Sequence, residues 1–177
     1  SFSGTIPPEF GNLTNLISLE LESLSSCTIE NLDWLSSLSS LEDLTMDGTS
    51  LAKANNWVNA IIGLQNLEDL SLRSCDLSKV MNPYSSVVNS SSSIGSLFLD
   101  DNNLNSSSYH WLCPLVGNRL MTFDVSSNSF DGKLSDFLNN LSRWTSVANL
   151  IYLDASKNQL TGSLSDEIQN FSSLNVL

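Results

Sequence analysis

The stretch VANLIYLDASKNQLTGSLSDEIQNF, from Val147 to Phe171, holds the pattern on which the whole chain is built. It follows LxxLxLxxNxLxGxLxxxI, whose positions are filled by Leu150, Leu153, Ala155, Asn158, Leu160, Gly162, Leu164 and Ile168. The alternating pair Leu153 and Ala155 predicts a short strand with one buried face. A helix-like return is expected from Ser165 to Phe171. Such a unit cannot bury its apolar side alone, so it needs similar units stacked on either side.

The strand pair recurs along the chain. The pairs are Leu19/Leu21, Leu44/Met46, Leu70/Leu72, Leu97/Leu99, Phe123/Val125 and Leu153/Ala155, with a seventh beginning at Leu177. Their spacings of 25, 26, 27, 26, 30 and 24 residues fit leucine-rich repeats and exclude TPR, ankyrin and WD40 periods. We therefore expect an α/β solenoid, a right-handed curved superhelix. A parallel β-sheet should line its concave side, and short helices or 3-10 turns its convex side.

Residues 1–177 are expected to form one leucine-rich-repeat domain of six full repeats, with partial repeats at both ends. The segment Ser1 to Phe10 matches the second half of a repeat whose strand is missing. The chain thus starts and stops inside a repeat, and neither end carries capping cysteines. Because an open solenoid end exposes core leucines, we expect a fragment of a longer ectodomain that aggregates or melts at low temperature on its own.

The composition excludes several classes of partner. The net charge is −12, and the seven Lys and Arg residues are too few for a nucleic-acid phosphate backbone. The same charge argues against contact with anionic membranes. The sequence contains no run of about 18 apolar residues that could span a bilayer, and no signal peptide is visible at its start.

The first residues show a resemblance to a known family. The run GTIPPEFGNLTNL, residues 4–16, resembles the GxIPxxLGNLxxL signature of plant extracellular leucine-rich repeats. The runs NLDWL, MDGTSLAKANNW and LRSCDLSKV resemble receptor-like proteins related to fungal-elicitor receptors. The resemblance implies a non-catalytic extracellular recognition module, either cell-surface or secreted, with a protein or peptide ligand. A co-receptor kinase is a further candidate partner, and no cofactor is implied.

Two other functions remain open at this point. The first is a secreted inhibitor of microbial cell-wall-degrading enzymes, of the polygalacturonase-inhibitor type. The second is an ice-binding solenoid, which would need flat, regularly repeated short polar residues. The outward columns here mix Glu, Thr, Ser, Phe and Asp, which disfavours ice binding. The sequence does not distinguish the receptor from the inhibitor, and it does not identify the ligand.

A ladder of residues is expected where each strand ends. Asn102, Asn128 and Asn158 occupy this position in the last three repeats, and Cys75 occupies it in the third. A stacked Asn amide can bond the loop backbone of neighbouring repeats. Leu24 and Thr49 replace Asn in the first two repeats, so the first turn should be less regular.

The returns between strands carry the tryptophans Trp34, Trp57, Trp111 and Trp144, which we interpret as convex-side core. Residues 31–41 and 55–64 are expected to be short helices, and residues 85–93 a polar loop. The three cysteines should remain unpaired thiols, because residues two or more repeats apart lie beyond disulfide reach.

Catalytic and metal sites are not indicated. The one histidine, His110, lies near no nucleophile motif. It supplies, with Cys113, only two of the ligands that zinc needs. Asp100-Asp101 and Asp166-Glu167 lack an EF-hand pattern. We therefore predict no enzyme activity and no metal.

Five sequons lie outside the predicted strands and favour a secretory origin; they begin at Asn12, Asn89, Asn105, Asn140 and Asn170.

The concave face is the candidate binding site. Residues that flank the buried pair of each strand point to the opposite face. The predicted ligand-binding residues are Glu20, Glu22, Glu42, Asp43, Asp47, Glu68, Asp69, Arg73, Phe98, Asp100, Asp124, Tyr152 and Asp154. The first three repeats place seven carboxylates around one arginine, which predicts a partner with a basic patch. Phe98 and Tyr152 are expected to be exposed aromatics that hold the partner.

Overall fold

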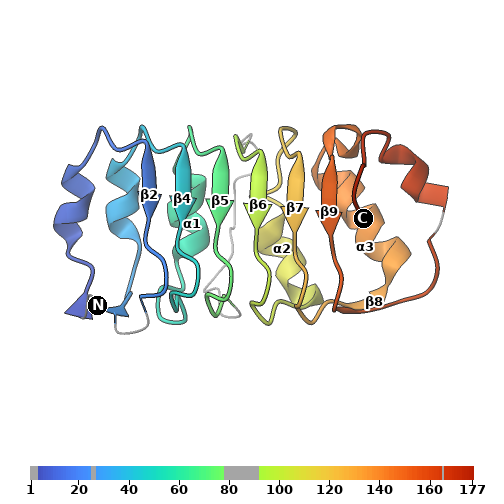
Figure 1. The fold of residues 1–177 in the computed structure, drawn as a ribbon, viewed down its shortest axis with the longest axis horizontal. Helices are drawn as coiled ribbons and strands as arrows, with labels where there is room; N and C mark the ends of the chain where they lie inside the picture. Colours follow the sequence, from blue (N-terminus) through green and yellow to red (C-terminus); the bar gives the residue numbers. More distant parts are fainter. Residues whose placement is uncertain (1–3, 25–26, 78–91, 165) are drawn as a thin grey trace.

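The computed structural model describes residues 4–24, 27–77, 92–164 and 166–177. Six short parallel strands lie side by side in the order of the sequence and form the main sheet (Figure 1). They are β2 (Ser18–Glu20), β4 (Asp43–Thr45), β5 (Asp69–Ser71), β6 (Ser96–Phe98), β7 (Thr122–Asp124) and β9 (Tyr152–Asp154). The solenoid predicted from the recurring strand pair is confirmed.

The register of the sheet matches the sequence pattern. The residues paired across successive strands are Leu19, Leu44, Leu70, Leu97, Phe123 and Leu153. The second apolar residue of each pair comes just after its strand and continues the ladder, as in Leu72 N–H to the Phe98 carbonyl at 2.9 Å. Both columns face inward, where Leu44, Leu70 and Leu97 are fully buried.

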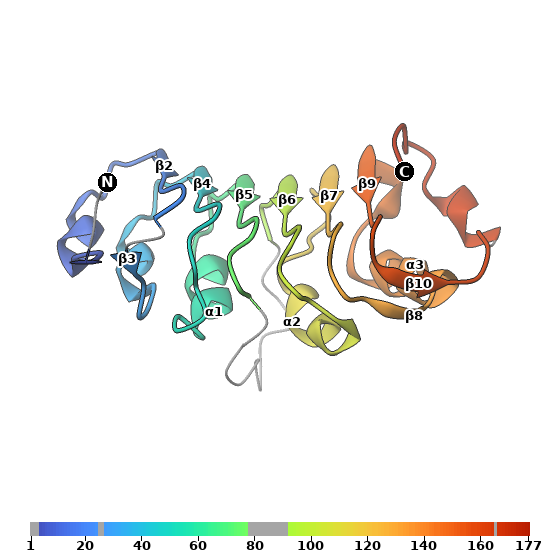
Figure 2. The same cartoon turned by 60° about the horizontal axis from the view of Figure 1, so that its bottom comes forward.

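Figure 2 shows the main sheet on the inner side of a shallow arc and the helices on its outer side. The helical segments are η1 (Pro8–Asn12), η2 (Asp33–Ser37), α1 (Trp57–Ile62), η3 (Ser106–Ser108), α2 (Tyr109–Leu112), α3 (Leu134–Trp144), η4 (Val147–Asn149) and η5 (Asp166–Asn170). The helices expected at 31–41 and 55–64 correspond to η2, which is a 3-10 helix, and to α1. The return expected at 165–171 corresponds to η5. The loop expected at 85–93 lies largely outside the described residues.

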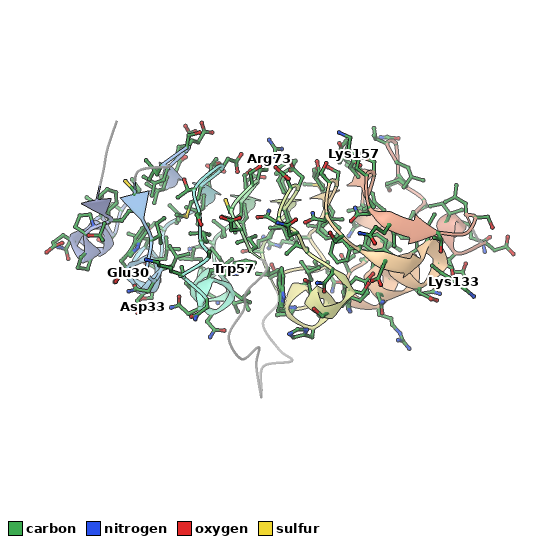
Figure 3. All side chains as sticks on the ribbon, turned by 90° about the horizontal axis from the view of Figure 1, so that it is seen from below. Glu30, Asp33, Trp57, Arg73, Lys133 and Lys157 are labelled. Carbon is green, nitrogen blue, oxygen red and sulfur yellow. The ribbon has the colours of Figure 1, made fainter. Side chains whose placement is uncertain are left out.

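The tryptophans pack in the interior, as predicted. Trp34, Trp57 and Trp111 are buried, and Trp144 packs against the core. Trp57 meets Trp111 edge to face, with ring centroids 5.1 Å apart. These rings fill the space between the sheet and the outer helices, where Figure 3 shows Trp57.

The long helix α3 was not expected from the sequence. Leu153 follows Phe123 by 30 residues, which leaves room for an eleven-residue helix in this return. Phe137, Leu138 and Leu141 turn one face of α3 into the core. Tyr109 of α2 stacks on Phe130 at 5.5 Å and contacts Trp144 at 5.4 Å, so aromatic rings fasten α3 to the preceding repeat.

Two small parallel sheets on the loop side were also not expected. One pairs β1 (Gly4–Thr5) with β3 (Cys27–Thr28), and the other pairs β8 (Asp131–Lys133) with β10 (Gln159–Thr161). They add backbone hydrogen bonds between successive repeats beyond those of the main sheet.

A left-handed residue ends each strand segment. Ser23, Gly48, Ser74, Asp101, Ser127 and Lys157 occupy the same repeat position, with φ between 52° and 67°. The first five donate their N–H groups to the carbonyl of the next repeat, as in Ser74 to Asp100 at 3.0 Å. Only Gly48 takes this conformation without steric cost, so the stacking bonds hold the other residues in it.

The asparagine ladder tightens the stack. Asn128 is buried, and its amide nitrogen donates to the carbonyls of Leu99, Val125 and Ser126 at 2.9 to 3.0 Å. Its Oδ1 accepts from the N–H groups of Asn102 and Leu104. Each Asn side chain therefore bonds its own turn and the turn of the preceding repeat. Asn102 and Asn158 repeat this arrangement.

Cys75 and Thr49 continue the ladder with fewer bonds. The Cys75 thiol donates to the Met46 carbonyl at 3.1 Å, and burial raises its pKa to about 12, so it remains protonated. The Thr49 hydroxyl accepts from Leu24 N–H at 3.2 Å and donates to the Leu21 carbonyl at 2.9 Å. Thr49 thus links the first two repeats, a role the sequence pattern did not reveal. Cys27, Cys75 and Cys113 are free.

We expect Asn128→Ala to lower the free energy of unfolding by about 3 kcal/mol or more, because it leaves several buried backbone groups without partners. The control is Asn139→Ala on exposed α3 surface, which should change it by less than about 0.5 kcal/mol. Urea unfolding followed by circular dichroism measures both. Equal stability of the two variants would show that the ladder does not hold the stack.

Candidate functional site

The outward residues of the main sheet form three columns. Strand register places Asp43, Asp69 and Tyr152 in the first column, and Glu20, Phe98, Asp124 and Asp154 in the second. Glu22, Asp47, Arg73 and Asp100 follow just after the strands and form the third column, while Glu42 and Glu68 immediately precede β4 and β5. All the predicted ligand-binding residues therefore lie on or beside one face of one sheet.

Arg73 is held in place by its neighbours. Its Nε lies 3.0 Å from Asp100 Oδ1, and its Nη1 lies 4.0 Å from Asp47 Oδ2. The guanidinium also lies over the Phe98 ring, 4.3 Å from the ring centroid. Asp47 is fixed in turn, because Oδ1 accepts from Ser71 Oγ at 2.7 Å and from Arg73 N–H. Arg73 and Phe98 thus form a stacked plate (Figure 3 labels Arg73 on the sheet side).

The structure changes two expectations from the sequence, that Phe98 and Tyr152 are exposed aromatics. Phe98 is half-buried, because Arg73 covers one face of its ring, and Tyr152 is half-buried as well. Partial burial and the Asp124 carboxylate raise the pKa of Asp100, although Arg73 opposes this shift. Arg73 therefore pairs with Asp47 and Asp100, two of the three carboxylates of the third column, and its charge is already committed to them.

Glu42, Asp43, Glu68 and Asp69 form an acidic cluster on β4, β5 and the residues just before them. Partial burial raises the pKa of Asp43. The negative charge of Asp69 adds to the shift, as does a hydrogen bond with Asp69 that favours the protonated acid, and the Glu42 and Glu68 charges act in the same direction. Within the described residues, no Lys or Arg forms an ion pair with this cluster. No ion pair in the described part of the chain therefore offsets its mutual repulsion.

The polar side chains of β9 form hydrogen bonds with each other and with the backbone just after the strand. The Tyr152 hydroxyl lies 3.4 Å from Asp154 Oδ2, and Asp154 Oδ1 accepts from Ser156 N–H at 2.8 Å. Partial burial alone would raise the pKa of Asp154, but the hydrogen bonds from Ser156 and Tyr152 outweigh it and hold that pKa below its usual value. Partial burial and the carboxylates of Asp124 and Asp154 raise the pKa of Tyr152, so its hydroxyl remains a donor.

Sequence reasoning missed a groove beside the first column. A hollow of about 890 Å³ follows the ends at which β5, β6, β7 and β9 begin, and its lining includes Glu68, Asp69, Gly95, Arg119, Met121 and Ile151. A signal was present in the sequence, because Gly95 stands where the other repeats carry a side chain. The depth of the groove, however, depends on how the repeats stack.

The sequons lie away from the concave columns. Asn12, Asn105 and Asn170 are exposed, and Asn140 is half-buried in α3. Asn105 also caps η3, since its Oδ1 accepts from Ser107 N–H at 2.9 Å. Asn89 lies outside the described residues.

The described residues offer neither a metal site nor a membrane-spanning helix. His110 is exposed in α2, and the described residues contain no group of three or more His, Cys, Asp or Glu that could hold a metal ion. Among the described residues, none of the helices is both long and apolar enough to cross a membrane.

Comparison with known proteins agrees with the geometry. A family model described as Leucine Rich Repeat matches residues 149–171. Receptor-like protein EIX1 of Solanum lycopersicum is 37% identical over 142 residues, which cover 79% of this chain and 14% of that protein. The chain therefore spans about a seventh of the length of this relative.

Solved structures show the same fold. The ectodomain of the Arabidopsis thaliana receptor kinase GASSHO1/SCHENGEN3, in complex with CASPARIAN STRIP INTEGRITY FACTOR 2, matches 99% of this chain and 19% of that chain, with TM-score 0.66 and 21% identity. The ectodomain of the Arabidopsis receptor kinase HAESA, in complex with an extended IDA peptide hormone, matches 99% of this chain and 31% of that chain, with TM-score 0.58 and 20% identity.

Because the carboxylates of the acidic cluster repel one another, we expect the removal of one charge to change the free energy of unfolding in a pH-dependent way. A carboxyl whose pKa is raised on folding destabilises the folded protein above that pKa, and the penalty disappears as the pH falls below the ordinary value of 3.8. We therefore expect Asp43→Asn to raise the free energy of unfolding at pH 7, by no more than about 0.5 kcal/mol because the group faces solvent.

The control for this variant is Glu30→Gln, an exposed acid on the return side. Urea unfolding between pH 3 and pH 7 measures both variants. The idea is wrong if Asp43→Asn behaves like Glu30→Gln at pH 7, or if its advantage grows as the pH falls.

Proposed function

Since the chain is a leucine-rich-repeat protein that resembles the plant receptor-like proteins, we propose that it is an extracellular recognition module for a protein or peptide with a basic patch. The supporting observation is the acidic cluster, which lies on the inner face of the main sheet and forms no ion pair with a Lys or Arg of the described residues. Like charges on adjacent strands destabilise a sheet. A cationic partner explains their presence, because it would remove this repulsion on binding.

The rest of the face supports the same proposal. Arg73 and Phe98 form a plate fixed by Asp47 and Asp100, and Tyr152 is oriented toward Asp154. Side chains that are already ordered lose little entropy when a partner docks on them. The acidic cluster would then attract and orient the partner, while the plate and Tyr152 would hold it.

The relatives support a receptor role. The tomato relative is named a receptor-like protein, and both receptor kinase ectodomains were solved with a peptide or protein ligand. We assign the chain by analogy to the cell surface or the extracellular space, with a co-receptor as a further candidate partner. No catalytic step is part of this proposal.

Four substitutions test the binding face. Phe98→Ala and Tyr152→Ala should raise the off-rate by about tenfold or more, because they remove central aromatic contacts. Glu42→Lys and Asp69→Lys should lower the on-rate several-fold, and this effect should shrink as salt is added. The ligands are peptides selected on the wild-type protein from a displayed random library, and surface plasmon resonance gives both rates.

The matched control is Glu30→Lys, which makes the same charge change on the return side (Figure 3). It should leave both rates close to those of the wild type. Failure to select any binder would contradict the proposal. Binders whose rates are unchanged by all four substitutions would show that this face is not the site.

Secretion predicts glycans at the sequons Asn12, Asn89, Asn105, Asn140 and Asn170. Glycopeptide mass spectrometry of protein secreted from plant cells should find at least partial occupancy. In Thr14→Ala, which keeps Asn12 but removes its sequon, the glycan at Asn12 alone should be lost. Secreted protein with all five sites unmodified would refute the secretory assignment.

A further inference from the structure

The groove beside the first column, here called the rim groove, has the size of a ligand site. It spans the beginnings of β5, β6, β7 and β9, is open to solvent and has a volume of about 890 Å³, within the range of small-ligand pockets. It adjoins the acidic cluster, since Glu68 and Asp69 belong to both. None of the proposed holding contacts, the Arg73–Phe98 plate or Tyr152, lines it.

A missing side chain opens the groove. One repeat position is occupied in successive repeats by Glu68, Gly95, Met121 and Ile151. Backbone hydrogen bonds of 2.7 to 2.8 Å link them in turn: Gly95 N–H donates to the Glu68 carbonyl, Met121 N–H to the Gly95 carbonyl, and Ile151 N–H to the Met121 carbonyl. A Cβ at Gly95 would make ordinary contacts, 3.6 Å from Met121 Cε and 3.7 Å from the Glu68 carbonyl. The backbone thus accepts a side chain here, and its absence leaves a space above Gly95 that the Met121 methyl group borders.

The floor beyond this space includes exposed apolar side chains. Met121 is 47% exposed and Ile151 is 41% exposed, and they are neighbours that immediately precede the adjacent strands β7 and β9. Apolar side chains that adjoin on a surface gain free energy when a partner covers them. Methionine also adapts its shape to different partners. The rim groove therefore has an acidic end at β5. Toward β7 and β9 it presents two exposed apolar side chains beside the polar residues Asn118, Arg119 and Asn149.

The spacing of the strands determines which side-chain spacing a peptide needs to match the rim groove. Neighbouring strands lie about 4.8 Å apart, so Met121 and Ile151 lie about 10 and 14 Å from Glu68 across the sheet. An extended peptide places side chains on one face every 6.6 to 6.8 Å, so residues two and four positions apart lie about 7 and 13 Å apart. If a basic residue of the peptide lies above Glu68 and Asp69, the peptide residue two positions away lies over Gly95 and Met121. The peptide residue four positions away then lies over Ile151.

We propose that the rim groove binds an extended peptide segment in which apolar residues stand two and four positions along the chain from a Lys or Arg. The basic group pairs with Glu68 and Asp69, the first apolar side chain fills the space above Gly95, and the second covers Ile151. This assignment rests on the proposed function, that the concave side binds a protein or peptide, and it specifies one sequence feature of that ligand.

The test uses a short synthetic peptide whose arginine is followed, at the second and fourth residues, by leucines, with serine and glycine elsewhere. Titration into isotope-labelled protein, followed by amide NMR shifts, should show saturable binding centred on Gly95, Ser96 and Met121. A peptide of the same composition with arginine and both leucines adjacent should bind at least several-fold more weakly.

Two variants locate the peptide. Gly95→Leu fills the space above Gly95 and should weaken binding at least tenfold, and Ile151→Ser should weaken it several-fold. The matched control is Ile17→Ser, since Ile17 holds the same repeat position as Ile151, is 54% exposed and does not line the groove. Glu68→Gln with Asp69→Asn should also weaken binding, whereas Glu30→Gln on the return side should not.

Several results would overturn the assignment. These are no saturable binding of the ordered peptide, equal binding of the rearranged peptide, or equal binding to a folded Gly95→Leu protein. Self-association of the free protein that Ile151→Ser abolishes would show that a second copy occupies the groove instead. Library-selected ligands that depend on Phe98 and Tyr152 but tolerate Gly95→Leu would reject the groove and leave the proposed function standing.

Discussion

Hydrogen bonding between equivalent positions of successive repeats is the constraint on which the structure depends. Each strand of the main sheet has only three residues, too few to hold register by itself. The amides of Asn102, Asn128 and Asn158 extend the contact past the strand end and bind each turn to its neighbour. The left-handed residues after the strands add backbone bonds to the same stack. Because the repeats cannot slip, every outward side chain has a fixed place in a column.

Fixed columns give the inner face its chemistry. In the third column, Arg73 lies between Asp47 and Asp100, and the three form an ion-paired, ordered unit with Phe98. In and beside the first column, Asp43 and Asp69 lie on adjacent strands with Glu42 and Glu68 next to them. The same register therefore relieves one set of carboxylates and concentrates another. That contrast, rather than the net charge of the chain, marks the acidic cluster as the place where a cationic partner gains most.

The two ends of the inner face differ in their ladder residues and in the side chains that they expose. The first repeats replace the ladder Asn with Leu24, Thr49 and Cys75, and they carry the acidic cluster. The later repeats have the complete ladder and present apolar residues, Met121 and Ile151, beside the rim groove. A ligand lying across the strands would meet charge first and then apolar surface. A rigid scaffold that holds both at set distances can select a sequence by spacing as well as by composition.

The sequence by itself determined the repeat, its register and the direction in which each side chain points. This was possible because the apolar pair at Leu153 and Ala155 recurs, and a strand alternates its faces with a period of two. Stacking decided the rest. The 30-residue spacing before Leu153 gave no sign of the aromatic contacts that hold α3, and Thr49 showed its ladder role only beside Leu24. The position of Arg73 over Phe98 and the hollow above Gly95 depend on residues 24 to 27 positions apart in sequence, because only neighbouring repeats bring such residues within contact distance.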